Sequence, residues 1–269
     1  MCGIAGVISW EGPPEQMVVE RMTTALRHRG PDAGRVEKHG GAVLGHRRLS
    51  VIDLSDAATQ PMTDPESGIS IIFNGEIYNF KAIARALSDR GIKFTTKSDT
   101  EVLLRAFIEW DVDCLPKLIG MFAFAVWDKQ NNRLVLARDR LGKKPLYFSY
   151  TNGRVSFASE LTALGMDPVL NTELNSSALS QYFSLNYKLG SSCIFSGADQ
   201  VPPACYLEFT QGKGVRKVQY WDLASAFKNK LGLISESEAT ERLAELLDDA
   251  VSLRLNSDVP IGTFLSSGL

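Results

Sequence analysis

Short runs of apolar residues, separated by turn-forming residues, recur along much of the chain and predict β-strands. The predicted strands cover residues 3–10, 42–44, 49–54, 69–73, 121–128, 133–139, 145–150 and 155–159. The last four are joined by short turns that contain Asn or Gly, which is typical of an antiparallel meander. The strand at 69–73 is expected to end in a hairpin-type turn at Asn74-Gly75, because both residue types tolerate positive φ.

Apolar residues spaced three and four apart predict amphipathic helices between and after these strands. The predicted helices cover residues 17–26, 80–90, a segment that begins at 98–101, and 237–256. Ser98 and Glu101 match a capping box, which marks the start of a helix. Helices between two groups of strands indicate an α+β fold in which two sheets stack and helices cover the outside.

The composition changes near residues 212–214, and this change predicts a domain boundary. We expect one domain over 2–212, a linker over 213–234 and the incomplete start of a second domain over 235–269. That last part holds one predicted helix, one predicted strand at 258–264 and half a loop, which are too few elements to bury a core. The helix at 237–256 is therefore expected to expose its apolar face.

Composition and charge exclude several classes of protein. With 44% hydrophobic and 22% charged residues, the chain has the composition of an ordinary globular protein. Its net charge is −2 and no basic stripe with interleaved aromatic residues occurs, so we expect no nucleic-acid partner. Its apolar runs are shorter than the ~20 residues that cross a bilayer, and the N-terminus lacks the layout of a signal peptide. We therefore expect a cytoplasmic protein without a membrane partner.

The cysteines and histidines do not have the spacing of metal ligands. No C-x-x-C pair occurs, so the pattern predicts neither a zinc site nor a disulfide framework. We expect the histidines to be surface or hydrogen-bonded residues, and we expect no metal site. The residues concerned are Cys2, Cys114, Cys193, Cys205, His28, His39 and His46.

The cysteine at position 2 has a special chemistry if the initiator methionine is removed, which its small size favours. Its α-amino group would then be free, and such a group has a pKa of about 7.7–8.0. A neutral amine can act as a general base for the thiol of the same residue. The alternative is an ordinary buried cysteine, and Cys2 alone does not decide between the two.

Thiolate attack on a carboxamide creates an oxyanion, which needs fixed hydrogen-bond donors. Asn74 offers an amide side chain and Gly75 an unhindered backbone N–H, although Asn-Gly is also an ordinary hairpin turn. An amino-acid substrate needs a cation for its carboxylate, a role that suits Arg48. Asp99 and Glu76 could bind its ammonium group, while helix capping is the alternative for Asp99.

With these residues in view, the chain resembles the class II glutamine amidotransferases, whose nucleophile is an N-terminal cysteine. The matching segments are 1–6 (MCGIAG), 27–32 (RHRGPD), 46–50 (HRRLS), 73–79 (FNGEIYN) and 98–101 (SDTE). Two further segments, 120–124 (GMFAF) and 137–147 (ARDRLGKKPLY), are similar to the glutamine-hydrolysing asparagine synthetase branch. The resemblance covers essentially the whole chain, in the family's order.

The resemblance implies an N-terminal-nucleophile hydrolase-like fold, an αββα sandwich of two antiparallel sheets. It implies that Cys2 forms a γ-glutamyl thioester, with Asn74 and Gly75 as the oxyanion hole. It further implies that Arg48, Glu76 and Asp99 hold the backbone groups of glutamine, and that this domain needs no cofactor.

The C-terminal segment 259–268 (VPIGTFLSSG) resembles the start of the pyrophosphate-binding loop of an α/β ATP-pyrophosphatase-type synthetase domain. Ser266, Ser267 and Gly268 would then contact ATP, which the complete enzyme would use with Mg²⁺. Ser267 departs from the pattern, since the commoner form has glycine there. The resemblance thus implies glutamine, aspartate and ATP as small-molecule partners and leaves a homodimer open.

Three functions remain to be separated. The first is a glutamine-hydrolysing asparagine synthetase, of which this chain alone would only hydrolyse glutamine. The second is an amidotransferase of the same family with another acceptor, such as a sugar carboxylate. The third is a regulatory module without catalysis, which is disfavoured because every expected catalytic position is filled.

Overall fold

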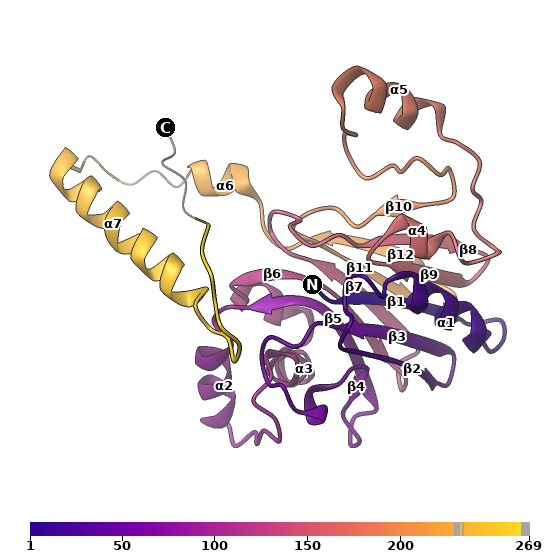
Figure 1. Ribbon diagram of the computed structural model, residues 1–269, viewed down its shortest axis with the longest axis horizontal. Helices are drawn as coiled ribbons and strands as arrows, with labels where there is room; N and C mark the ends of the chain where they lie inside the picture. The colour runs from indigo at the N-terminus through magenta and orange to yellow at the C-terminus, as the bar shows by residue number, and fades with distance from the viewer. Residues whose placement is uncertain (229–231, 233, 265–269) are drawn as a thin grey trace.

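The computed structural model describes residues 1–228, 232 and 234–264. Within this part of the chain, the strands form two six-stranded sheets whose neighbouring strands are all antiparallel (Figure 1). The first sheet has the order β10 (Asp199–Gln200), β8 (Tyr147–Thr151), β9 (Arg154–Ala158), β1 (Gly3–Ser9), β3 (Ala42–Arg48), β2 (Ala33–His39). The second has the order β12 (Gly214–Gln219), β11 (Cys205–Thr210), β7 (Arg133–Arg138), β6 (Gly120–Asp128), β5 (Ile69–Ile77), β4 (Met62–Thr63).

Helices cover the outer faces of both sheets or extend from them. They are α1 (Gln16–Ala25), α2 (Phe80–Ser88), α3 (Asp99–Trp110), α4 (Leu161–Leu164), α5 (Ser176–Leu185), α6 (Leu223–Lys228) and α7 (Glu236–Leu253), with 3₁₀ turns at η1 (Asp56–Ala58) and η2 (Asp111–Lys117). No helix in the described residues is both long and apolar enough to cross a membrane.

Three apolar clusters hold the layers together, and β5 shows how they arise. Successive side chains of a strand point to opposite faces. Ile72 accordingly joins the cluster between the two sheets, whereas Ile71 and Phe73 join the cluster under α2 and α3. A third cluster packs α1 and α4 against the outer face of the first sheet. The predicted αββα sandwich is therefore confirmed.

Most predicted elements are present with shifts of a few residues at their ends. The predicted helix at 17–26 is α1, that at 80–90 is α2, that beginning at 98–101 is α3, and that at 237–256 is α7.

The capping box predicted at the start of α3 is half formed. Ser98 Oγ accepts a hydrogen bond from Glu101 N at 3.2 Å, as a capping box requires. The Glu101 carboxylate instead accepts from the backbone N–H groups of Thr95 and Thr96, so the reciprocal half of the box is not formed.

Four expectations about local structure were wrong. The strand predicted at 49–54 is a loop, because β3 ends at Arg48 and the chain turns through Asp53, whose φ is +51°. Asn74-Gly75 is not a turn: β5 continues to Ile77 and stays paired with β6 as far as Gly120. No strand forms at 258–264, where the chain pairs with neither sheet in the described structure.

The fourth error concerns the predicted meander. The strands β6 and β7 lie in one sheet, whereas β8 and β9 lie in the other, so the chain crosses between sheets after Arg138. Polar contacts hold this crossover: the Arg138 guanidinium donates to the carbonyls of Gly142, Lys144 and Val201. The pattern also missed β2, a largely polar edge strand, and the late strands β10, β11 and β12.

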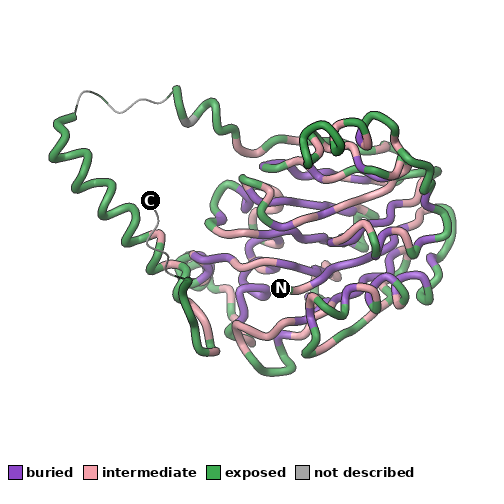
Figure 2. Tube along the Cα trace, turned by 45° about the horizontal axis from the view of Figure 1, so that its top comes forward, coloured by how far each residue is buried: buried purple, intermediate pink, exposed green. Residues whose placement is uncertain are grey.

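The helix α7 projects away from the two-sheet body (Figure 1), and Figure 2 shows it exposed along most of its length. Its apolar side chains Leu243, Leu246, Leu247 and Val251 are each more than half exposed. The expected exposure of this apolar face is therefore confirmed for the chain as described.

Candidate active site

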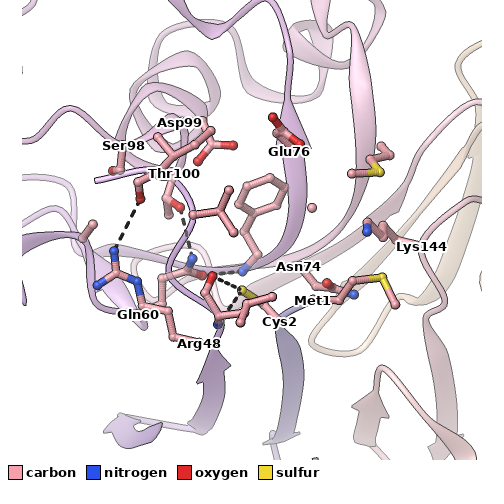
Figure 3. Close-up of a pocket in the computed structure, with 17 residues that line it drawn as sticks. Met1, Cys2, Arg48, Gln60, Asn74, Glu76, Ser98, Asp99, Thr100 and Lys144 are labelled. Atoms are coloured by element: carbon pink, nitrogen blue, oxygen red, sulfur yellow. Dashed lines mark hydrogen bonds between the residues drawn. The ribbon is translucent and has the colours of Figure 1, made fainter. Parts of the chain in front are cut away.

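A cavity of about 150 Å³ lies where the N-terminus, the end of β3, the middle of β5 and the start of α3 meet (Figure 3). The six residues predicted for glutamine chemistry all line it: Cys2, Arg48, Asn74, Gly75, Glu76 and Asp99. The fold thus brings together side chains that are scattered over the first part of the sequence.

Cys2 is held in place through both its side chain and its backbone carbonyl. Its Sγ lies 3.4 Å from Leu49 N, which donates to it, and Arg29 Nε donates to the Cys2 carbonyl at 2.9 Å. Arg29 is itself anchored by an ion pair with Glu160 at 2.8 Å. Burial raises the pKa of the Cys2 thiol, and the Leu49 N–H and the terminal amine only partly oppose this. The thiol therefore needs a base to become a nucleophile.

The terminal amine lies on the residue before this thiol and acts on it electrostatically. Burial lowers the pKa of the Met1 α-amine, and the positive charges of Lys144 and Arg29 lower it further, against the opposing effects of Cys2 and Asp32. A lowered pKa favours the neutral amine, the form that can accept a proton.

Asn74 presents a buried amide with unused hydrogen-bonding capacity. It is 0% exposed, and in the described structure neither its Nδ2 nor its Oδ1 has a hydrogen-bond partner. Buried polar groups are almost always paired, so such an amide calls for an explanation.

Gly75 is the next residue, at a place where β5 and β6 approach closely. A Cβ at this position would lie 2.3 Å from the Met121 carbonyl oxygen. Only glycine fits, and its backbone lines the cavity beside the Asn74 amide.

Arg48 lines the cavity and also fixes its wall. Its guanidinium donates to the Ser55 carbonyl at 2.8 Å and to the Asp53 carbonyl. The loop over 49–55 is tied further by the segment after α7, since Asp53 N donates to Asp258 Oδ2 at 2.7 Å and Asp258 N to the Val51 carbonyl at 2.9 Å. The cation predicted for a substrate carboxylate thus already holds backbone carbonyls. Its role as a ligand group stays a prediction.

Two carboxyl groups form an acidic end of the cavity. Asp99, 6% exposed, accepts from Ile77 N at 3.1 Å, and burial raises the pKa of its carboxyl group to about 7, with the nearby Glu76 adding to the rise. Burial also raises the pKa of Glu76, although Lys144 opposes this. Asp99 does not cap α3, because Ser98 does. The capping alternative for Asp99 is therefore wrong, and its carboxyl group is available to a cation.

Sequence reasoning did not single out two residues that shape this cavity. Gln60 bridges β5 and α3, with its Oε1 accepting from Phe73 N at 2.6 Å and its Nε2 donating to Thr100 Oγ1 at 3.0 Å. Lys144 also lines the cavity and is only 4% exposed. Lys144 lies within the segment 137–147 that carries the family resemblance, so a signal was present there.

Two of the histidines, His28 and His46, make the surface or hydrogen-bonded contacts that the sequence predicted, whereas the buried Nε2 of His39 has no hydrogen-bond partner in the described structure. His28 contacts Glu160 at 3.0 Å on the surface, and His46 Nε2 lies 3.2 Å from the Phe73 carbonyl. Burial lowers the pKa of His46 to about 3, so its imidazole is neutral at physiological pH. Neither of these histidines lines the cavity, so neither is a candidate base for the Cys2 thiol. The predicted ATP-contacting residues, Ser266, Ser267 and Gly268, lie outside the described residues.

The sandwich of two antiparallel sheets carries an N-terminal thiol in a cavity that amide, carboxylate and guanidinium side chains also line. The model of the glutamine amidotransferase domain matches residues 1–221, and that of asparagine synthase matches residues 242–269. The chain therefore belongs to the class II glutamine amidotransferase family and carries the start of an asparagine synthase domain. The boundaries predicted at 212 and 235 stay predictions.

Relatives agree with this assignment. The chain is 38% identical to "Asparagine synthetase [glutamine-hydrolyzing] 3" of Bacillus subtilis, over 100% of this chain and 44% of that protein. It is 34% identical to "Amidase chry2" of Gibberella zeae, over 100% of this chain and 41% of that protein. The chain thus spans less than half the length of either relative.

A solved structure has the same fold. The glutamine phosphoribosylpyrophosphate amidotransferase of Bacillus subtilis, complexed with ADP and GMP, aligns with a TM-score of 0.59 at 19% identity. The alignment covers 82% of this chain and 49% of the other. At this identity the likeness shows the fold alone, and it supports the N-terminal-nucleophile architecture.

Proposed function

We propose that the cavity hydrolyses glutamine to glutamate and ammonia, with Cys2 as the nucleophile. The observation that carries this proposal is the orphaned Asn74 amide, which lines the same cavity as the Cys2 thiol. A buried donor without a partner is costly unless it serves a ligand or a transition state. An oxyanion formed next to the thiol would accept the hydrogen bonds that the Asn74 amide and the Gly75 N–H can donate.

The reaction follows from these groups. The free amine of processed Cys2 accepts the thiol proton, and the sulfur attacks the side-chain carboxamide carbon of glutamine. When the tetrahedral intermediate collapses, the C–N bond breaks, the amine returns the proton and ammonia leaves. Water then attacks the γ-glutamyl thioester, releasing glutamate and restoring the thiol.

The two ends of the cavity suit the two ends of the amino acid. Asp99 and Glu76 would bind the substrate ammonium, and Arg48 would bind the carboxylate. Losing a charged hydrogen bond costs about 1.5–3 kcal/mol, which is roughly tenfold or more in binding. Arg48→Ala should therefore mainly raise KM, and its additional bonds to the 49–55 loop predict some loss of stability as well.

For the complete protein we propose a glutamine-hydrolysing asparagine synthetase, in which the ammonia reacts with aspartate activated by ATP and Mg²⁺. The match of residues 242–269 to asparagine synthase and the asparagine synthetase named above support it. The alternative is a different acceptor, such as a sugar carboxylate, and the relative named an amidase keeps it open.

The first test measures glutamate release from glutamine by wild type, Cys2→Ala and a form that retains Met1. We expect both altered forms to lose hydrolysis, because one lacks the thiol and the other lacks the free amine beside it. Cys205→Ala is the matched control, since Cys205 is buried in β11 away from the cavity. Wild-type rates in Cys2→Ala, or no hydrolysis by the processed wild type, would reject the proposal and favour a non-catalytic module.

A further inference from the structure

Lys144 is a nearly buried residue that lines the same cavity as Cys2. The residue is 4% exposed, and its side chain lies beside Met1 (Figure 3). Among the described residues, its ammonium group forms neither a hydrogen bond nor an ion pair. Buried lysines are rare unless they are paired, because desolvation of the charge is costly. A lysine kept in this position therefore points to a function in the cavity.

The backbone of Lys144 is fixed from both sides. Lys144 N donates to Asp139 Oδ2 at 3.0 Å, and the Lys144 carbonyl accepts from Arg138 Nε at 2.7 Å. Both partners are themselves buried, and the Asp139 carboxylate also accepts from Phe122 N at 3.1 Å. The crossover between the two sheets thus delivers the lysine to the cavity on rigid backbone, which is how a charge must be held to act electrostatically.

The charge of Lys144 reaches the groups that carry out the proposed chemistry. Lys144 lowers the pKa of the Met1 amine, and the Cys2 thiol in turn raises the pKa of Lys144. Removal of Met1 would place the free amine on Cys2 itself. The other charged groups around Lys144 are Arg29, Glu76 and Asp139. Around the terminal amine and the thiol they also include Asp32, Arg48 and Asp99.

We propose that Lys144 is a positioning residue of the glutaminase site, whose fixed positive charge keeps the processed Cys2 amine neutral and stabilises negative charge on its sulfur. This inference rests on the proposed function of Cys2 and deepens it. A nearby cation disfavours protonation of an amine and favours ionisation of a thiol. Burial lowers the pKa of Lys144 itself, with Arg29 as a further cause, while the negative groups oppose that effect. Both consequences for Cys2 act in the same direction, toward a reactive nucleophile at lower pH.

The test compares Lys144→Met and Lys144→Arg with wild type, all processed to Cys2. The matched control is Lys143→Met, because Lys143 is the adjacent lysine and is exposed. Two pH profiles are measured for each: kcat/KM for glutamine, and the rate of Cys2 alkylation by iodoacetamide without substrate. Mass spectrometry assigns the alkylation to Cys2, and thermal unfolding confirms that each variant is folded.

In each profile the rate falls on the acid side, and we call this part of the curve the acid limb. For Lys144→Met we expect the acid limb of both profiles to move to higher pH by half a pH unit or more. That corresponds to about a threefold loss of rate or more at a pH below the limb, because each pKa unit is tenfold in protonation equilibrium. Lys144→Arg should keep its limb at or near the wild-type position, and Lys143→Met should match wild type.

Unchanged limbs in Lys144→Met would overturn the inference, as would a limb that moves equally in Lys143→Met. If wild type does not hydrolyse glutamine, the proposed function fails, but the alkylation profile still reports on the charge of Lys144. If Lys144→Met does not fold, Lys144→Gln replaces it in the same two profiles.

Discussion

The buried carboxyl of Asp99 ties the stability of the protein to its proposed substrate binding. Burial raises the pKa of Asp99 to about 7, whereas an unfolded chain gives aspartate a pKa of about 3.9. Between these two values the folded protein binds a proton that the unfolded chain has lost. The free energy of unfolding must therefore fall as the pH rises through this window and level off above it.

The magnitude follows from the pKa difference. The pKa of Asp99 in the folded protein lies about three pH units above that in the unfolded chain, and each pH unit corresponds to ~1.4 kcal/mol. The ionised form of Asp99 therefore costs the folded state about 4 kcal/mol above pH 7. Asp99→Asn removes the titration and can keep the hydrogen bond from Ile77 N. Relative to wild type, the variant should gain about 3 kcal/mol between pH 5 and pH 8.

Urea unfolding at pH 5 and pH 8 measures this gain, and Asp89→Asn serves as the control because Asp89 is exposed at the end of α2. The same variant should lose glutamine binding at pH 8, since an amide cannot pair with the substrate ammonium. A gain that is no larger at pH 8 than at pH 5 would refute the idea that Asp99 is a strained, buried carboxylate at neutral pH.

Three further predictions follow from single contacts. Asn74→Ala should lower kcat for glutamine about 10²–10³-fold with little change in KM, because it removes an oxyanion donor. An unchanged kcat in steady-state kinetics would show that Asn74 is only structural. Gly75→Ala should lower the melting temperature and the activity, because the new Cβ would lie 2.3 Å from the Met121 carbonyl oxygen, and an unchanged melting temperature would contradict the close approach. Asp258→Ala should speed hydrogen exchange at the Asp53 amide, which donates to the Asp258 carboxylate at 2.7 Å, and equal exchange in both proteins would show that this contact does not hold the loop.

Local pattern determined much of the architecture. Short apolar runs between turn-forming residues predicted the central strands, and apolar residues spaced three and four apart predicted α1, α2, α3 and α7, because each helix needs an apolar face toward a core. The family segments predicted the sandwich and the six residues that line one cavity. These features depend on the types and spacing of neighbouring residues, which the sequence contains directly.

The sequence pattern was wrong where a long-range contact outweighs local preference. Asn74-Gly75 has the residues of a turn, yet pairing with β6 keeps both inside β5. The segment 49–54 has the residues of a strand, yet Arg48 and Asp258 hold it as a loop beside Cys2. In both cases hydrogen bonds to distant parts of the chain decide the conformation.

Cys2, Asn74 and Asp99 could be named from the sequence, but their electrostatic state could not. The pKa of Asp99, the amide of Asn74 that has no partner in the described structure, and the lowered pKa of Lys144 all depend on burial and on neighbours from other parts of the chain. Desolvation and Coulomb interactions depend on distances in space, which only the packed layers establish. The sequence therefore determined which groups the site contains, and the tertiary structure decided how each of them is charged and held.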